Sequence, residues 1–132
     1  MDKEDWKLVV ETAKEIEKEV YELTEKISLR GRGIGILRTG LRKTAFSIVS
    51  NVTQAISDVR NRDSLICLQG SLSQLMVLDY YNFISRKVGY LSSSQYLRLK
   101  KMAKDITDRL SLSLKDLERH GSDSIFPGPM KV

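Results

Sequence analysis

A chain of 132 residues, 41% hydrophobic and 30% charged, has the size and composition of one globular domain, which excludes a wholly disordered protein. One cysteine, Cys67, and one histidine exclude an intramolecular disulfide and a Cys/His metal site. No run of about 18 apolar residues occurs, so we expect no membrane-spanning helix. The acidic start MDKEDWK lacks the apolar segment of a signal peptide, so we expect a cytoplasmic protein.

The net charge of +5 is unevenly distributed along the chain. Residues 1–29 contain nine acidic and five basic residues, which leaves −4 there and +9 in residues 30–132. We therefore expect one face or end of the fold to be basic, which is a clue to a partner. Because both prolines lie in the last six residues, the rest of the chain lacks the strongest helix breaker, and we expect long helices.

The first predicted helix covers residues 3–28. Its apolar residues alternate in steps of three and four, the heptad pattern of a helix that packs at a shallow angle in a bundle. The glycine-rich segment SLRGRGIG, residues 28–35, then predicts a connection between helices. It lacks the preceding strand and the GK[ST] sequence of a nucleotide-binding loop. Arg30 and Arg32 in this connection are candidates for contacts with a phosphate backbone.

The same spacing predicts a second helix over residues 34–59, followed by the turn RNRD at 60–63. The third helix, predicted over residues 64–88, has apolar residues on two sides and must bury both. Because one small core covers one side, we interpret the second side as a subunit interface; the alternative is a helix at the centre of its own monomer. The predicted interface residues are Gly70, Ser73, Val77, Tyr81, Ile84 and Val88.

Gly89 is expected to end the third helix, and Ser92 with Gln95 has the pattern of a capping box that starts the fourth. The fourth helix is predicted to run to about residue 119, with a basic exposed side. Four long helices with short connections predict an all-α, antiparallel up-down-up-down four-helix bundle over residues 1–120. Residues 121–132 are turn-rich and are expected to form a flexible C-terminal tail.

The segments AFSIVSNV at residues 45–52 and LQGSLSQL at residues 68–75 resemble the four-helix-bundle family of 23S rRNA intervening-sequence proteins. The residues that match the family pattern are Leu41, Arg42, Lys43, Ala45, Ser47, Ile48, Asn51, Val52, Gly70, Ser71, Leu72, Leu75, Gly89 and Tyr90. The chain departs from the pattern where Gln54 and Gln74 replace two glutamates, which keeps hydrogen-bonding capacity and removes charge.

The resemblance implies a four-helix bundle that assembles as a homopentameric ring. The accessory variability proteins of diversity-generating retroelements are similar in fold, and they form a basic pentameric barrel that binds nucleic acid and a partner reverse transcriptase. The resemblance therefore implies three expected partners, which are further copies of this chain, RNA or DNA, and a reverse transcriptase.

The leading functional hypothesis is a non-catalytic, homo-oligomeric protein that binds nucleic acid through basic surfaces. RNA is the favoured nucleic acid, and ribosomal RNA is one candidate target. The alternative to nucleic-acid binding is that the basic side chains form an ordinary solvated surface. The candidate nucleic-acid-binding residues are Arg30, Arg32, Arg38, Arg42, Lys43, Arg60, Arg62, Lys100, Lys101 and Lys104.

The second hypothesis is a protein-interaction adaptor, such as an accessory subunit of a reverse transcriptase, that docks through the acidic face of the first helix. An enzyme is the least favoured class, because no Ser/His/Asp, Cys/His or metal-binding pattern is present beside the single histidine, His120. We therefore expect no catalytic residues and no cofactor.

Overall fold

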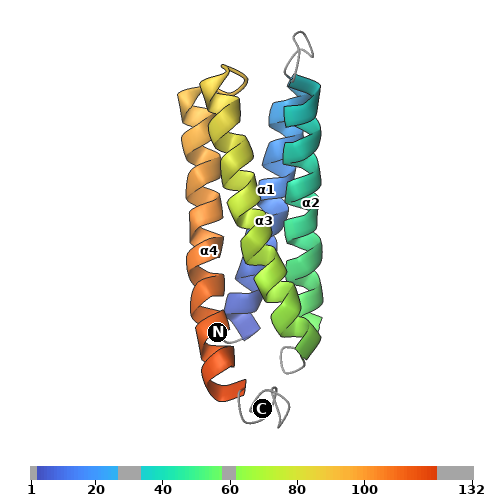
Figure 1. Ribbon diagram of the computed structural model, residues 1–132, viewed down its shortest axis with the longest axis vertical. Helices are drawn as coiled ribbons and strands as arrows, with labels where there is room; N and C mark the ends of the chain where they lie inside the picture. Colours follow the sequence, from blue (N-terminus) through green and yellow to red (C-terminus); the bar gives the residue numbers. More distant parts are fainter. Residues whose placement is uncertain (1–2, 27–33, 58–61, 122–132) are drawn as a thin grey trace, which may run out of the picture.

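A computed structural model describes residues 3–26, 34–57 and 62–121, which are helical except for the short connection before the last helix (Figure 1). The four helices are α1 (Lys3–Lys26), α2 (Ile34–Ser57), α3 (Arg62–Lys87) and α4 (Ser93–Gly121). Their ends lie within about two residues of the predicted bounds, as is usual for such assignments. The all-α class is confirmed. None of these four helices is both long and apolar enough to cross a lipid bilayer.

Successive helices run in opposite directions, each packs against the next, and α4 closes the bundle against α1 (Figure 1). The predicted up-down-up-down four-helix bundle is therefore confirmed. One end of the bundle holds the C-terminal ends of α1 and α3 and the N-terminal ends of α2 and α4. At this end α3 lies beside α4, and at the opposite end it inclines toward α2 (Figure 1).

The heptad positions of the four helices form the core, and their side chains are at most 8% exposed. The residues of this core are Trp6, Val9, Ala13, Ile16 and Val20 on α1, Leu41, Ala45, Ile48, Val52 and Ala55 on α2, Leu65, Leu68, Leu75 and Leu78 on α3, and Leu99, Ala103, Ile106 and Leu110 on α4. Burial of one such Leu, Ile or Val side chain contributes roughly 1.5–3 kcal/mol, so these positions dominate the stability of the fold.

Polar residues take three core positions that the heptad pattern assigns to a neighbouring leucine. In α3, Ser71 is buried beside a half-buried Leu72. Thr24 is buried beside a half-buried Leu23, and Ser113 is buried beside a half-buried Leu114. The cause is geometric, because a helix with 3.6 residues per turn drifts by about 20° per heptad from a strict 3.5-residue repeat. Thr24 satisfies its buried hydroxyl locally, since Oγ1 donates to the carbonyl of Val20 at 2.6 Å.

The connection between α3 and α4 ends one helix and starts the next with two complete capping motifs. Gly89 has φ of +79°, and its N–H and that of Tyr90 donate to the carbonyls of Arg86 and Ser85 at 3.2 and 2.8 Å, which is a Schellman motif. In the capping box, Ser92 Oγ accepts from Gln95 N–H at 3.2 Å, while Gln95 Oε1 accepts from Ser92 N–H at 2.9 Å. Both predicted caps are confirmed.

Two glycines lie where α2 and α3 approach each other. A Cβ atom on Gly40 of α2 would overlap the ring of Tyr81 on α3. A Cβ atom on Gly70 of α3 would lie 3.5 Å from Asn51 Nδ2 of α2, which is ordinary contact. Gly70, one of the residues predicted to lie in a subunit interface, therefore adjoins α2 of the same chain.

Candidate nucleic-acid interface

Basic residues are concentrated in the segments at the end of the bundle where α2 and α4 begin and α3 terminates. Figure 1 shows these helix ends side by side. Residues 34–43, 80–87 and 93–104 contribute nine lysines and arginines there and no aspartate or glutamate. These nine residues, which we call the basic end, are Arg38, Arg42, Lys43, Arg86, Lys87, Arg98, Lys100, Lys101 and Lys104. The antiparallel topology brings together charges that lie far apart in the sequence.

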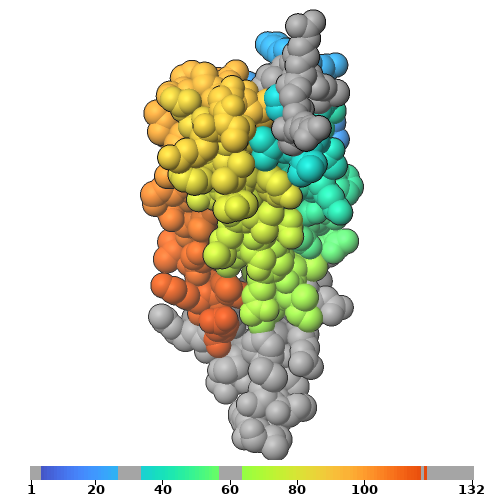
Figure 2. All heavy atoms as spheres, turned by 45° about the horizontal axis from the view of Figure 1, so that its top comes forward, coloured from blue at the N-terminus to red at the C-terminus, as the bar shows by residue number. Residues whose placement is uncertain are grey.

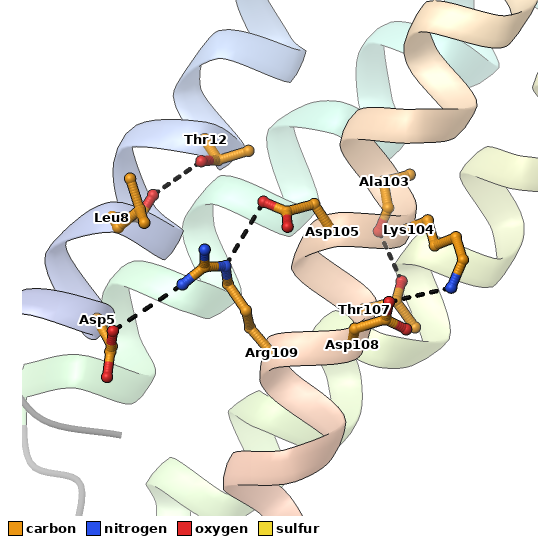
Figure 3. Close-up of polar contacts among 9 residues, drawn as sticks. All are labelled: Asp5, Leu8, Thr12, Ala103, Lys104, Asp105, Thr107, Asp108 and Arg109. Carbon is orange, nitrogen blue, oxygen red and sulfur yellow. Dashed lines mark hydrogen bonds and ion pairs between the residues drawn. The ribbon is translucent and has the colours of Figure 1, made fainter.

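Helix α1 carries the opposite charge along its length, with eight acidic and five basic residues and a balance of −3. Ion pairs hold it to α4. Arg98 Nε lies 3.4 Å from Glu19 Oε1, and Arg109 Nη1 lies 3.9 Å from Asp5 Oδ1 (Figure 3). Arg98 and Arg109 therefore lie on the side of α4 that faces α1, whereas Lys100 and Lys104 lie between α4 and α3.

The described candidates for nucleic-acid binding fall almost entirely at the basic end. Lys43, Lys100, Lys101 and Lys104 are exposed, and Arg38 is half-buried. Arg30, Arg32 and Arg60 lie outside the described residues. Arg62 begins α3 at the opposite end of the bundle, so it is remote from the others.

Arg42, the remaining candidate, is engaged within the bundle. Its Nε donates to Thr24 Oγ1 at 2.7 Å, and its guanidinium carbon lies 4.5 Å from the ring centre of Tyr21. Nη2 also donates to the Tyr21 carbonyl at 3.4 Å. The side chain therefore links α2 to α1, and these contacts limit what it offers to an external phosphate.

Two lysines of the basic end face α3 and have partners of their own. Lys100 Nζ donates to Tyr96 Oη at 3.1 Å. This hydrogen bond, with the nearby negative charge of Asp79, raises the pKa of Lys100 above its ordinary value, so the ammonium stays charged at neutral pH. Lys104 pairs with Asp108 at 3.0 Å, but both side chains are exposed and the pair is correspondingly weak (Figure 3).

The six predicted interface residues lie on the side of α3 that turns outward or toward α2. Ser73, Val77 and Val88 are exposed, and Gly70 and Ile84 are half-buried. Tyr81 is half-buried as well, because its ring packs against Gly40 and lines a shallow groove on α2. Part of the Tyr81 side chain is therefore used inside the subunit.

Three further residues that sequence reasoning missed lie on the side of α3 next to α4. Met76, Tyr80 and Phe83 are 74%, 64% and 45% exposed. In Figure 2 this part of α3, coloured yellow to yellow-green, forms a surface beside the orange α4. Their spacing of four and three residues, typical of one helix face, is visible in the sequence. Each of them directly precedes a predicted interface residue, which is Val77, Tyr81 or Ile84.

Cysteine and acidic residues form no evident reactive group in the part of the chain that the structure describes. Cys67 is half-buried, and its Sγ lies 3.4 Å from Gln54 Oε1 as a weak hydrogen-bond donor. Within residues 3–26, 34–57 and 62–121, no three His, Cys, Asp or Glu side chains gather as metal ligands would.

The fold has a counterpart among solved structures. A crystal structure of a protein with unknown function from the S23 ribosomal protein family of Bacteroides thetaiotaomicron superposes with a TM-score of 0.76 and 15% sequence identity. The match covers 84% of this chain and 98% of the other. No protein-family model and no curated protein matches the sequence. At this identity the likeness shows the four-helix fold alone.

Proposed function

We propose that this protein is a non-catalytic, self-associating four-helix bundle that binds nucleic acid, RNA foremost, through its basic end. The observation that carries the proposal is the concentration of positive charge in three segments, since residues 34–43, 80–87 and 93–104 hold nine cations and no anion. Such a cluster attracts the phosphates of a nucleic acid whatever its nucleotide sequence, and association releases counterions from the nucleic acid. The neighbouring fold comes from a family named for a ribosomal protein, which agrees with an RNA target.

Self-association is supported by a surface almost without charge on α2 and α3. Residues 44–57 of α2 and 64–78 of α3 contain no ionisable acid or base other than Cys67. Exposed apolar side chains lie on these helices, among them Phe46, Ile66 and Val77. Exposed apolar side chains on helices with so few charges are typical of a protein interface. We propose that copies of the chain pack through it into a ring, with a pentamer as the expected size, which repeats the basic end around the assembly.

The salt dependence of RNA binding tests the basic end. The triple variant K100Q/K101Q/K104Q removes three of its cations, so we expect weaker binding to a structured RNA hairpin. The plot of log K against log salt should become less steep. Its negative slope should decrease in magnitude by about 2–3, since each lost phosphate contact removes about 0.7–0.9. K7Q/K14Q/K115Q is the matched control, because it removes the same charge from exposed lysines elsewhere. Equal binding by both variants, or none by the wild type at low salt, contradicts the proposal.

Light scattering tests the ring. We expect the wild type to have the mass of five chains. V77E places a charge on the exposed side of α3, and V88E places one directly after its last residue, so each should have a lower mass. L112E is the control, since Leu112 is an exposed apolar residue on α4. A monodisperse wild-type monomer at micromolar concentration removes self-association from the proposal.

A second candidate is an adaptor that docks a partner protein, such as a reverse transcriptase, through α1. It draws on the exposed acids of that helix, among them Glu11, Glu15 and Glu22. Reversal of these three charges should abolish capture of the partner and leave RNA binding unchanged. Loss of RNA binding in the same variant contradicts the adaptor hypothesis.

A further inference from the structure

A groove of about 640 Å³ runs along the outer surface between α3 and α4. Its α3 wall includes Met76, Tyr80 and Phe83, and its α4 wall includes Tyr96, Lys100 and Lys104. The groove begins within the basic end and continues toward the middle of the bundle. The apolar and aromatic residues of the α3 wall therefore lie beside lysines that are proposed above to contact phosphates.

The aromatic rings of the groove are available for stacking. Tyr80 and Phe83 are 64% and 45% exposed, and Tyr96, from the facing helix, is half-buried. Aromatic side chains on which bases stack, beside cations that follow the backbone, are the two elements of sites for single-stranded nucleic acid. In a duplex the base faces are covered by neighbouring bases, so only unpaired nucleotides can use such rings.

Cations lie over two of these rings, while the ring of Tyr80 has no such contact among the described residues. Lys87 Nζ is 5.8 Å from the ring centre of Phe83, and Lys100 Nζ is 5.4 Å from that of Tyr96. A backbone whose bases entered the groove would find these ammonium groups at its rim. The neighbouring Lys101 and Arg86 are exposed and add to the same positive field.

The groove also contains two carboxylates, each beside a lysine. Asp108 pairs with Lys104 at 3.0 Å, and Asp79 acts on Lys100 electrostatically. Each carboxylate therefore offsets part of the charge of one groove lysine, and Lys87 over Phe83 adds a further positive charge beside them. Carboxylates also accept hydrogen bonds from the amino groups of bases, as Asp and Glu do from cytosine N4.

We propose that the α3–α4 groove binds unpaired nucleotides, with bases stacked on Tyr80 and Phe83 and the backbone held by Lys87, Lys100 and Lys104. This inference rests on the proposed function and narrows its target from nucleic acid in general to single-stranded segments. An apolar partner helix is less well matched, because burial under such a helix would desolvate two carboxylates and two lysines.

Binding of matched probes tests the groove. The probes are an unstructured RNA of about 12 nucleotides, within the site sizes such grooves cover, and the duplex of the same sequence with its complement. We expect the wild type to prefer the single strand. Y80L and F83L keep the apolar surface but remove the ring faces, and each should weaken single-strand binding about 5- to 100-fold. L112A is the control, because Leu112 is a similarly exposed apolar residue on α4 outside the groove.

The possible results separate this inference from the proposed function. If Y80L and F83L bind the single strand as L112A does, or if the wild type binds duplex as tightly, the groove inference is wrong, while the basic end is still tested by K100Q/K101Q/K104Q. If the wild type binds neither probe at low salt, the proposed function fails first. If Y80L and F83L lower the assembled mass and leave RNA affinity unchanged, the groove is an interface between copies, and the inference is overturned.

Discussion

The ring of Tyr81 on α3 fills the space that a side chain on Gly40 of α2 would need. Gly40 is buried in the middle of a turn of α2, and no other residue type fits there without a shift of the ring. Gly35, in the first turns of the same helix, has no neighbour within 4 Å of an added Cβ. Position 35 of α2 therefore has space for a side chain, whereas position 40 does not.

Substitution by alanine should separate these two glycines. G40A is expected to destabilise the fold by about 1–3 kcal/mol, the usual cost of overpacking. G35A should be neutral or stabilise it by up to about 1 kcal/mol, because alanine has the higher helix propensity. Urea unfolding measures both. The smaller side chain in G40A/Y81A should restore part of the loss, and equal stability of G40A and G35A contradicts the tight packing.

The fold could be predicted from the sequence almost completely, because heptad spacing and local caps are short-range signals. The caps at Gly89 and Ser92 depend on residues at most a few positions apart. The heptad spacing is wrong by one residue at three core positions, where Thr24, Ser71 and Ser113 are buried in place of a neighbouring leucine. There the straight helix has drifted from the heptad repeat, so the buried stripe has moved by one residue.

The candidate site could be predicted only in part, because it depends on which side of a helix faces which neighbour. The charge of Arg42 is evident from sequence, but its contact with Thr24 on α1 spans eighteen positions and requires the packed bundle. Tyr80 and Tyr96 also come from different helices. Sequence spacing shows few aromatic residues interleaved with basic ones, whereas α3 and α4 together place them in one groove.

The contacts of Arg42 predict a structural cost for its removal. R42A should destabilise the bundle by about 1.5–3 kcal/mol, the range for a hydrogen bond made by a charged group. R42K keeps the charge but loses the planar stack over Tyr21 and the Nε bond to Thr24. It should therefore be nearly as destabilised as R42A. Thermal or urea unfolding measures the effect, with K43A on the exposed neighbour as control. Wild-type stability of R42K indicates that charge alone matters.

The hydroxyl of Tyr90 predicts a pH dependence. Tyr90 is 5% exposed, and its Oη has no hydrogen-bond partner within the described residues. Burial raises the pKa of this phenol above 10.0, with a smaller opposing effect of Arg38 and Arg42. Above about pH 10 the unfolded chain therefore loses this proton first, which favours unfolding. Stability from the neutral phenol is complete below that pH and is lost as pH rises through the folded-state pKa.

Y90F tests this sign directly. At neutral pH it should be at least as stable as the wild type, because it removes a buried polar group without a partner. Its advantage in urea unfolding should grow between pH 7 and about pH 11, since phenylalanine does not ionise. Y80F is the control, because the Tyr80 hydroxyl belongs to an exposed side chain. An advantage that stays constant with pH would show that the Tyr90 phenol ionises alike in both states.

The caps of the α3–α4 connection predict a loss of stability at one end of the bundle. G89A places alanine at φ of +79°, a left-handed conformation that costs about 1–2 kcal/mol for a residue with a Cβ. S92A removes the acceptor for the Gln95 N–H and should cost about 0.5–2 kcal/mol. S93A, one residue later, is the control, since Ser93 is exposed and opens the helix proper. Urea midpoints at neutral pH measure all three. Because Gly89 lies four residues before α4 begins, G89A should also increase amide exchange in the first turn of α4. Unchanged exchange there would mean that the Schellman motif does not fix the start of that helix.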